Sequence, residues 1–335
     1  MSPTLSVIVL NWNGEKLLGE FLPSVIANTQ DPDVEVIVAD NGSTDGSLKL
    51  LCEEFPNVKL IAFDENLGFS GGYNKAISEV SSEYVVLLNS DVETPPGWWQ
   101  PMLAFMKANP EVGACQPKIL SYVRKDMFEY AGAAGGLLDR YGYPFCRGRL
   151  FDRIEYDLCQ YDVFPEDIAW ASGAALMVRR DAYLEAGGLD ELFFAHMEEI
   201  DLCCRMHNLG YRVCVVPDSH VYHLGGATLN QGNPRKTYLN FRNNLLLLHK
   251  NLPEKKGRKV LFKRRLMDTL AFMMYVAKFD FPNAKSILKA HKDFRKMKRN
   301  YTSFPEQDVL SSLPGADRCI VFDRYLPLKK LFKKG

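Results

Sequence analysis

The stretch YVVLLNSDVETPPGWW (residues 84–99) combines a buried strand pattern with a carboxylate at its end. Its first residues, Tyr84 to Leu88, are apolar and β-forming, which predicts a buried strand. The run stops abruptly at Asn89-Ser90-Asp91, and two prolines and two tryptophans follow. A buried strand that ends in a carboxylate either turns into the next segment there or presents the charge to a ligand.

The residues before this stretch alternate between strand and helix patterns. Apolar runs at 5–12, 34–40 and 58–63 predict three further strands, and segments with helical spacing of apolar residues separate them. This alternation predicts an α/β fold with a Rossmann-like, mostly parallel sheet flanked by helices. Ligands of such sheets bind at the carboxyl ends of the strands.

Polar residues follow each of the four predicted strands. Asn11 and Asp40 come after the first two, the loop ENLGF (65–69) after the third, and Asp91 after the fourth. Because the ends of parallel strands meet at one edge of the sheet, we expect these groups to form a single site.

Size and charge set the remaining limits. The chain has 335 residues, 47% hydrophobic and 24% charged, which suffices for one large domain or two modest ones. Its formal net charge is zero, yet residues 250–300 hold 16 Lys/Arg against 4 Asp/Glu. The N-terminus lacks a signal-peptide pattern, and no apolar run reaches the roughly 18 residues of a membrane span, so we expect a cytoplasmic protein.

Two later segments carry further candidate groups. MEEIDLCCRMHNLGY (197–211) predicts a helix that ends at Gly210. RVCVVPDSHVYHLGG (212–226) predicts a strand and then a loop that holds His220 and His223. The segment 113–180 predicts mainly loops and short strands. The eight cysteines are irregularly spaced, which favours buried free thiols over a zinc site.

Seven motifs in order resemble the family 2 glycosyltransferases of GT-A fold, especially the rhamnosyltransferase-like and galactofuranosyltransferase-like branch. They cover roughly residues 4–228 and are SVIVLNWNGEKLL, VIVADNGSTDGS, ENLGFSGGYNKAI, YVVLLNSDVETPPGWW, WASGAALMVRRDAYLEAGGLDE, FFAHMEEIDLCCRMHNLGYRV and HVYHLGGAT. The resemblance implies a GT-A domain over residues 1–230 and leaves a basic helical C-terminal region over 231–335.

The resemblance implies a divalent cation, Mn²⁺ or Mg²⁺, held by Asp91 and His223 on the diphosphate of a nucleotide-sugar. The family usually has Asp-x-Asp at residues 89–91. Asn89 replaces the first Asp, so its expected role is weaker, through the ribose or a water molecule. The alternative is that Asp91 only caps the turn.

Donor binding is implied for a second set of residues. Asp40 would meet the base or ribose, although the same loop could simply cap the next helix. The glycine-rich loop would approach the phosphates closely. The expected donor-side residues are Asn11, Asp40, Asn66, Gly68, Asn74, Asn89 and Asp91.

Glu199 stands where the family usually has its catalytic Asp, and Glu198 is the alternative base. We expect Asp201 to be structural, as a partner of Arg205 one helical turn on. The alternative for the acidic residues is a solvated helix face. On the acceptor side, the resemblance implies Trp170, Ser172 and Gly173, with the indole as a platform for a sugar. Trp98 and Trp99 are expected to pack the next helix onto the sheet.

Two interpretations of the basic C-terminal helices stay open. They lie on an anionic membrane surface, which would place the protein at the inner face of the membrane, or they form a helical bundle packed on the catalytic domain. Nucleic-acid binding is not expected, because no binding motif is present.

The sequence thus predicts an inverting, metal-dependent glycosyltransferase. Its donor would be a UDP- or dTDP-linked sugar. Its acceptor would be a hydroxyl of a cell-envelope polysaccharide or of a lipid-linked glycan precursor. The alternatives are a nucleotidyltransferase that makes nucleotide-sugars and a non-catalytic carbohydrate-binding relative.

Overall fold

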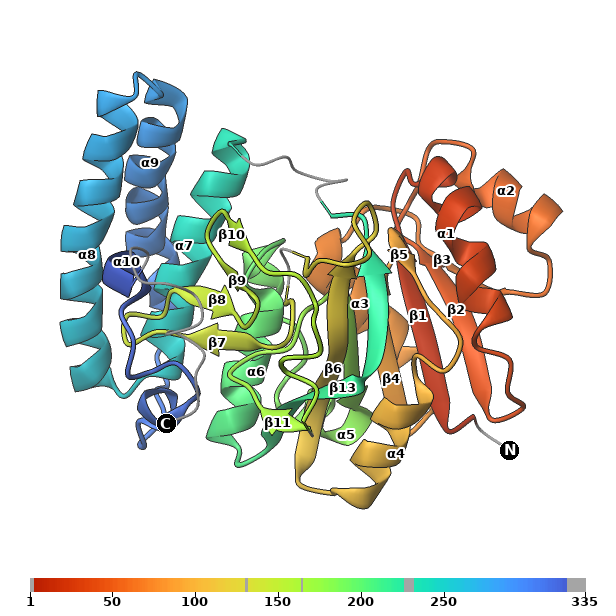
Figure 1. The fold of residues 1–335 in the computed structure, drawn as a ribbon. Helices are drawn as coiled ribbons and strands as arrows, with labels where there is room; N and C mark the ends of the chain where they lie inside the picture. Colours follow the sequence, from red (N-terminus) through yellow and green to blue (C-terminus); the bar gives the residue numbers. More distant parts are fainter. Residues whose placement is uncertain (1–2, 130–131, 164, 226–231, 324–335) are drawn as a thin grey trace.

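The computed structural model describes residues 3–129, 132–163, 165–225 and 232–323 of the chain. Figure 1 shows a central sheet with helices on both faces and a group of long helices at one side. The end of the HVYHLGGAT motif, residues 226–228, lies outside the described residues.

The central sheet has nine strands, in the order β11-β13-β6-β12-β4-β1-β2-β3, with β5 paired to β13. Its strands are β1 (Leu5–Asn11), β2 (Val34–Asp40), β3 (Lys59–Ala62), β4 (Tyr84–Asn89), β5 (Val92–Glu93), β6 (Val112–Ser121), β11 (Glu166–Asp167), β12 (Ala175–Arg179) and β13 (Arg212–His223). β1 to β4 pair in parallel, whereas β12 runs antiparallel between β4 and β6. The prediction of a mostly parallel sheet flanked by helices is confirmed.

Alternating residues of the parallel strands face two hydrophobic clusters. Val7 and Val9 of β1 pack with α1 (Glu15–Ala27) and α4 (Gln100–Ala108) on one face. Ile8 faces the other cluster, which includes α3 (Gly68–Ser78), α5 (Arg180–Glu185) and α6 (Glu198–Asn208). The helix α2 (Ser47–Glu54) packs beside α1. Trp98 and Trp99 are buried with α1 and α4, as expected from the sequence.

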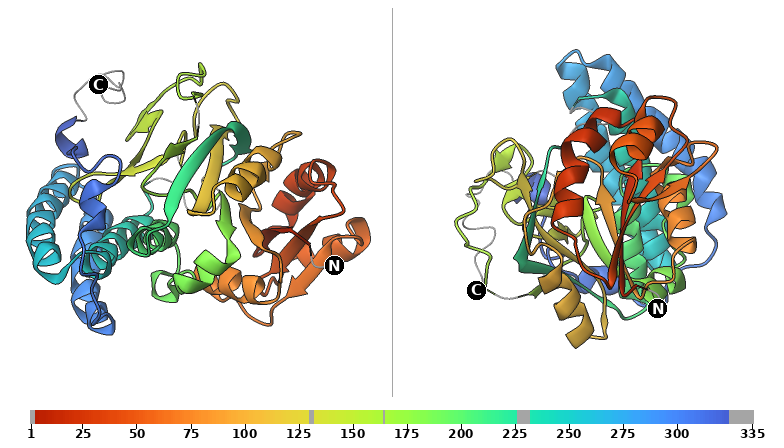
Figure 2. Two further views of the ribbon diagram at one scale, coloured as in Figure 1. Left: turned by 90° about the horizontal axis from the view of Figure 1, so that it is seen from below. Right: turned by 90° about the vertical axis from the view of Figure 1, so that its right-hand side faces the viewer.

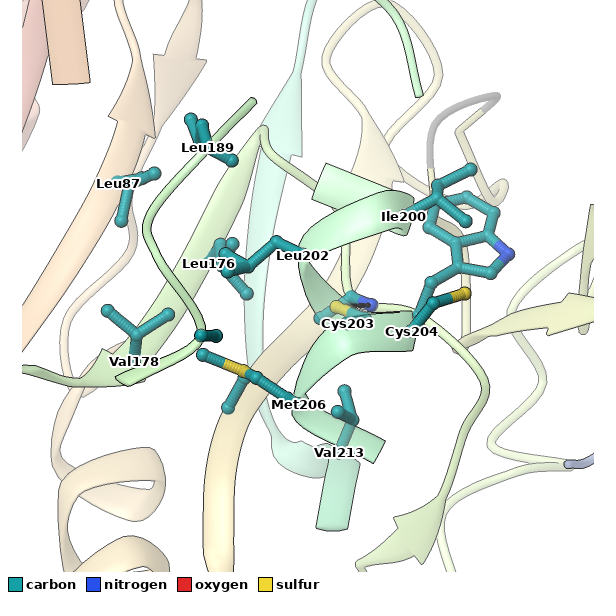
Figure 3. Packing of buried hydrophobic residues seen from close by; sticks show 14 of the residues in the cluster. Leu87, Leu176, Val178, Leu189, Ile200, Leu202, Cys203, Cys204, Met206 and Val213 are labelled. Atoms are coloured by element: carbon teal, nitrogen blue, oxygen red, sulfur yellow. Dashed lines mark hydrogen bonds between the residues drawn. The ribbon is translucent and has the colours of Figure 1, made fainter. Parts of the chain in front are cut away.

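The helix α6 is held rigidly because most of its surface is buried. Figure 3 shows Leu202 and Met206 of α6 directed toward Leu176 and Val178 of β12. Gly210 follows the helix with φ +91°, which is the expected cap position. The packing of α6 therefore fixes the position of the acidic residues at its N-terminus.

One strand differs from the prediction. β13 continues through Pro217 to His223, so His220 and His223 lie in a strand and not in a loop. The pairing with β6 shifts register between Val216 and His220. This irregularity accommodates Pro217, which has no N–H for the ladder, and the strand resumes behind it.

A small second sheet covers part of the segment predicted as loops and short strands. It consists of β7 (Gly136–Leu138), β8 (Pro144–Cys146), β9 (Arg149–Leu150) and β10 (Arg153–Ile154). The same segment also contains β6, which is a full ten-residue strand of the main sheet.

The C-terminal helices are α7 (Pro234–Asn251), α8 (Glu254–Ala277), α9 (Phe281–Met297) and the short α10 (Ile320–Asp323), with 3-10 turns η2 (Lys298–Asn300) and η3 (Val309–Ser312). Figure 2 shows α7 between the sheet and the other helices. Leu245 to Leu248 of α7 belong to the same buried cluster as β4 and α6. The predicted boundary near residue 230 falls just before α7, but the two regions share one core. No described helix is both long and apolar enough to cross a lipid bilayer.

Candidate active site

Asp91 and His223 meet at the carboxyl edge of the sheet. Asp91 follows β4 and His223 is the last residue of β13, and β5 joins the two segments by pairing Val92 with His223. The Oδ1 atom of Asp91 lies 3.2 Å from Nε2 of His223. Both side chains are largely buried. The structure thus brings together the two residues that the sequence predicts as metal ligands.

Electrostatics favour the charged forms of this pair, and a divalent cation bound at Nε2 of His223 would replace the proton there. Burial alone would raise the pKa of Asp91, but the neighbouring His223 lowers it below the usual value. Burial would likewise lower the pKa of His223, and Asp91 and Glu129 instead raise it to about 10. Glu129 reaches Nδ1 of His223 at 3.1 Å. Sequence reasoning did not single out Glu129, which lies far from any motif.

The chemistry of these groups fits a divalent cation. Neighbouring ligand atoms of an octahedral ion with bonds of about 2.1 Å are separated by roughly 3 Å, close to the separation of Asp91 Oδ1 and His223 Nε2. A histidine ligand commonly has its other ring nitrogen on a carboxylate, which is the position of Glu129. Asn89 also lies beside His223, with its Nδ2 atom 3.5 Å from Nε2 of that histidine.

The loops after β1 and β2 form one hydrogen-bonded surface beside this pair. Asn11 donates to Asp40 at 2.9 Å, and Asp40 accepts the backbone N–H of Ser43. Asn11 and Asp40 are therefore neighbours at the edge of the sheet, as predicted. The buried Oδ1 of Asn11 has no hydrogen-bond partner among the described residues, and a Cβ at Gly14 would lie 2.3 Å from it.

Trp12 is a candidate that sequence reasoning missed. It follows Asn11 directly, and 52% of its surface is exposed. A large exposed aromatic side chain at the end of a central strand can stack on a nucleobase. The available signal was its position immediately after a buried strand.

The loop after β3 is fixed by asparagine side chains. Asn66 Oδ1 accepts the backbone N–H of Gly68 at 2.8 Å, and Asn41 donates to the same oxygen at 3.1 Å. Gly68 has φ +73°, and a Cβ there would come within 3.1 Å of the Phe194 ring. Glycine is therefore required for the loop to lie against the segment before α6.

Asn74 is corrected from a donor-binding to a structural role. Its Oδ1 accepts from the Tyr183 hydroxyl and the Leu189 N–H, and its Nδ2 donates to Leu189 O and Glu191. These four bonds use its hydrogen-bonding capacity. A donor could reach Asn74 only by breaking them.

Glu198 and Glu199 begin α6, and both have a buried Oε2 without a hydrogen-bond partner among the described residues. Burial raises the pKa of Glu199 to about 7, against the opposing effect of backbone N–H groups at the helix start. Burial and the nearby charge of Glu199 raise the pKa of Glu198 well above its usual value. A carboxylate with a pKa near 7 suits a general base at neutral pH, whereas Glu198 is more deeply buried.

Asp201, two residues on, points into the protein. It is fully buried and pairs with Arg205 at 2.9 Å and with Lys250 of α7 at 2.9 Å. Asn251 also donates to it. The expected Arg205 contact is present, and Asp201 ties α6 to α7.

The 193–197 segment, which leads into Glu198, is held in a strained conformation. Phe194, His196 and Met197 have φ between +66° and +75°, a region that costs residues other than glycine of order 1–3 kcal/mol each. The Nδ2 atom of Asn243, on α7, donates to the backbone oxygens of Phe193, Ala195 and His196 at 2.7–3.0 Å. Arg242 bonds the Leu192 and Phe193 oxygens. We call Arg242 and Asn243 the α7 clamp.

The loop 172–174 joins the cation end of the site to the base. Ala174 O accepts the N–H of Asn89 at 3.0 Å, and a Cβ at Gly173 would lie 3.8 Å from Cβ of Glu199. Ser172 is buried, and its Oγ accepts the N–H of Ala174. Gly173 therefore borders Glu199, while Ser172 shapes the loop.

Trp170 is also corrected. It is only 5% exposed, its Nε1 donates to Leu137 O at 2.9 Å, and its ring packs on Gly136. An indole enclosed in this way cannot present its face to an acceptor sugar, so its role is to anchor the small sheet.

The described residues include one cluster of three metal-ligating side chains, Asp157, Cys159 and Asp162. The ammonium group of Lys118 already lies between its two carboxylates, at 2.8 Å and 2.6 Å. The two carboxylates of this cluster are therefore already paired with Lys118.

The chain is similar to known glycosyltransferases in sequence. The family described as "Glycosyl transferase family 2" matches residues 6–152. An N-acetylglucosaminyl-diphospho-decaprenol L-rhamnosyltransferase of Mycobacterium tuberculosis is 30% identical over 241 residues, which cover 67% of this chain and 76% of that protein.

Solved structures with the same fold are more distant in sequence. GalNAc-T7 with UDP, GalNAc and Mn²⁺ aligns with a TM-score of 0.60 and 16% identity, over 98% of this chain and 58% of that one. The mannosyltransferase PcManGT of Pyrobaculum calidifontis, with GDP-Man and Mn²⁺, aligns with a TM-score of 0.53 and 17% identity, over 99% and 83%. These similarities support the fold.

Proposed function

The chain belongs to the family 2 glycosyltransferases, and from that premise we propose that it transfers a sugar from a nucleoside diphosphate-sugar to an acceptor hydroxyl with inversion at the anomeric carbon. One observation carries the proposal. Glu199, a base candidate with a raised pKa, borders the loop 172–174. The same loop is hydrogen-bonded to Asn89 at the end of β4, two residues before Asp91.

Asp91 and His223 would hold a divalent cation, which neutralises the leaving diphosphate when it is bound. Glu129 orients the His223 ring through Nδ1. The exposed ring of Trp12 would stack on the base of the nucleotide, and Asn11 and Asp40 would border the nucleoside. The proposed donor is UDP- or dTDP-linked.

Glu199 would accept the proton of the acceptor hydroxyl as its oxygen attacks the anomeric carbon. The bond from that carbon to the diphosphate breaks, and the nucleoside diphosphate leaves with the electron pair. Attack opposite the leaving group inverts the centre, so no covalent intermediate is required. The pKa of about 7 keeps a substantial share of Glu199 ionised at neutral pH.

The proposed acceptor is a saccharide of a cell-envelope glycan or its lipid-linked precursor. The support is the Mycobacterium tuberculosis relative, whose name specifies an N-acetylglucosaminyl-diphospho-decaprenol acceptor and L-rhamnosyl transfer. Family membership also favours transfer over nucleotide-sugar synthesis.

A transfer assay tests the proposal. The full chain is incubated with Mn²⁺ or Mg²⁺, labelled UDP- or dTDP-sugars including rhamnose, and an N-acetylglucosaminyl-diphospho-polyprenol, and label is followed into the lipid-extractable product. We expect transfer by the wild type, with the product's anomeric configuration opposite to that of the donor. Glu199→Gln should lose at least a hundredfold in rate, within the usual range for removing a general base.

Glu198→Gln is the matched control at the neighbouring residue, and it should retain most of the activity. Loss of transfer in Glu198→Gln with retention in Glu199→Gln would reassign the base. Nucleotide binding by the wild type without transfer to any acceptor would favour the non-catalytic alternative.

A further inference from the structure

The helices α8 and α9 expose an apolar surface away from the core. Its members are half or more exposed, between 50% and 81%, and are Phe262, Leu266, Leu270, Met273, Phe279 and Phe281. The first four recur at helical spacing of three or four residues, so they share one side of α8. Val260, Arg264 and Asp268 occupy the opposite, buried side. We call the six exposed residues the hairpin face.

Cations border the hairpin face. Lys263 and Arg265 lie on α8 beside Phe262 and Leu266, while Lys278 and Lys285 flank the turn between α8 and α9. In the described part of the chain, none of these four cations forms an ion pair with a carboxylate. Their charge therefore remains available to a partner.

The carboxylates of the same two helices are engaged elsewhere. Asp268 pairs with Arg264 and with His291 inside the helical group. Asp280 caps α9, and Asp293 pairs with Lys289 and accepts from the Tyr238 hydroxyl. The surface around the hairpin face is thus apolar and positive, which is the composition of helices that lie at lipid interfaces.

The turn between α8 and α9 points to the same end of the molecule as the candidate active site. In Figure 1 the tops of α8 and α9 lie at the end where α7 begins and toward which β13 runs. β13 ends at His223. The tip of the hairpin and the candidate active site therefore lie toward the same end, whereas the hairpin face extends along the side of α8 as far as Phe262.

We propose that the hairpin face docks on an anionic lipid bilayer. The apolar side chains enter the boundary between head groups and acyl chains, and Lys263, Arg265, Lys278 and Lys285 lie at the level of the lipid phosphates. This docking goes beyond the proposed activity and does not depend on the nature of the donor.

Charge favours a bilayer over two other occupants. A second copy packed on the hairpin face would bring the same unpaired cations together, which is unfavourable. Residues 324–335, which lie outside the described structure, contain five Lys/Arg and no Asp or Glu, so they would add like charge. Anionic lipid supplies the opposite charge and an apolar phase together.

Vesicle flotation of the full chain tests the proposal, with phosphatidylcholine vesicles compared with vesicles containing 30% phosphatidylglycerol. We expect binding that requires phosphatidylglycerol and weakens at high salt. Lys278→Glu/Lys285→Glu should weaken binding about thirtyfold or more, because each cation removed costs roughly fivefold and the new carboxylates add repulsion. Leu266→Ser/Phe279→Ser should also weaken it.

Leu184→Ser/Leu209→Ser is the matched control, because both residues are about half exposed, at 48% and 46%, but lie on or beside α5 and α6. It should bind vesicles like the wild type. Melting temperature and nucleotide–Mn²⁺ binding should be unchanged in all three variants, which separates failure of docking from failure of the proposed function.

Three outcomes would overturn the proposal. One is absent binding, or equal binding to both kinds of vesicle. The second is a concentration-dependent dimer in sedimentation that Leu266→Ser/Phe279→Ser abolishes, which would assign the face to a second copy. The third is binding that survives the hairpin variants but is lost when Lys329, Lys330, Lys333 and Lys334 are changed to Glu, which would assign docking to the C-terminal segment.

Discussion

Replacing Asn243 by alanine should loosen the segment that delivers the proposed base. Asn243 is fully buried, and its Nδ2 donates to three backbone oxygens of the 193–197 segment, those of Phe193, Ala195 and His196. Alanine removes the donor and leaves these carbonyl groups without it. The segment then loses the hydrogen bonds that stabilise the strained conformation of its three residues with positive φ angles.

The expected loss of stability follows from the two N–H hydrogens of the Asn243 side-chain amide. One NH₂ group donates two full bonds, here shared over three oxygens, and each lost bond costs about 1–2 kcal/mol when the acceptor stays buried. We expect a loss of about 2–4 kcal/mol in the free energy of unfolding. For a chain of this length, about 1 kcal/mol lowers the melting temperature by roughly 1.5 °C, so the expected decrease is about 3–6 °C.

Calorimetry and hydrogen exchange measure the two consequences. The melting temperature should fall by the stated amount, and the amides of 193–199 should exchange faster at temperatures where β1 and β4 remain protected. Asn109→Ala is the matched control, because Asn109 makes a single side-chain bond, to Phe105 O. It should lower the melting temperature by no more than about 1–2 °C.

Unchanged melting temperature and unchanged exchange of 193–199 in Asn243→Ala would refute the α7 clamp. A fall in melting temperature with uniform loss of protection would show that Asn243 supports the whole core and not the segment.

Three further predictions concern the site. Transfer should rise with pH through about 7, because Glu199 must lose its proton to act as a base, and a flat profile would exclude it. The folded pKa of Glu199 lies above its unfolded value, so its contribution to stability is full below about 4.5 and falls as pH rises through 7. Glu199→Gln should therefore melt higher than the wild type at pH 8 but not at pH 4, whereas an offset independent of pH would contradict the burial argument. Trp12→Ala should weaken UDP or dTDP binding roughly 5- to 150-fold by loss of base stacking, with little change in melting temperature. Trp170→Ala should instead lower the melting temperature. The reverse pattern would exchange the roles of the two residues.

The parallel half of the sheet was predictable because its strands are continuous apolar runs. Tyr84–Leu88 and Val34–Asp40 are strands in the structure as the sequence predicts. Polar groups at their ends then had to meet at one edge. The helix at Glu198 was predictable from its apolar spacing and its glycine stop.

The missed features depend on tertiary contacts. Pro217 predicted the end of a strand, but the irregular pairing with β6 lets β13 continue to His223. Trp170 is enclosed by the small sheet, whose strands are too short to give a clear pattern.

The α7 clamp was also missed, although a signal is present in hindsight. Arg242 and Asn243 lie just before the apolar run of α7 that begins at Leu245, and both are buried. A sequence pattern does not distinguish a buried polar residue with partners from an exposed one, because the backbone oxygens that Asn243 meets lie some 50 residues away along the chain.

The most direct test of the account is calorimetric titration of UDP and dTDP into the protein with and without Mn²⁺, for the wild type and for Asp91→Asn. We expect Mn²⁺ to tighten diphosphate binding at least about tenfold in the wild type. We expect no such effect in Asp91→Asn, which should still bind the nucleotide weakly without metal. Equal enhancement by Mn²⁺ in both proteins would contradict the assignment of Asp91, and no enhancement in the wild type would contradict the cation site at the end of β4.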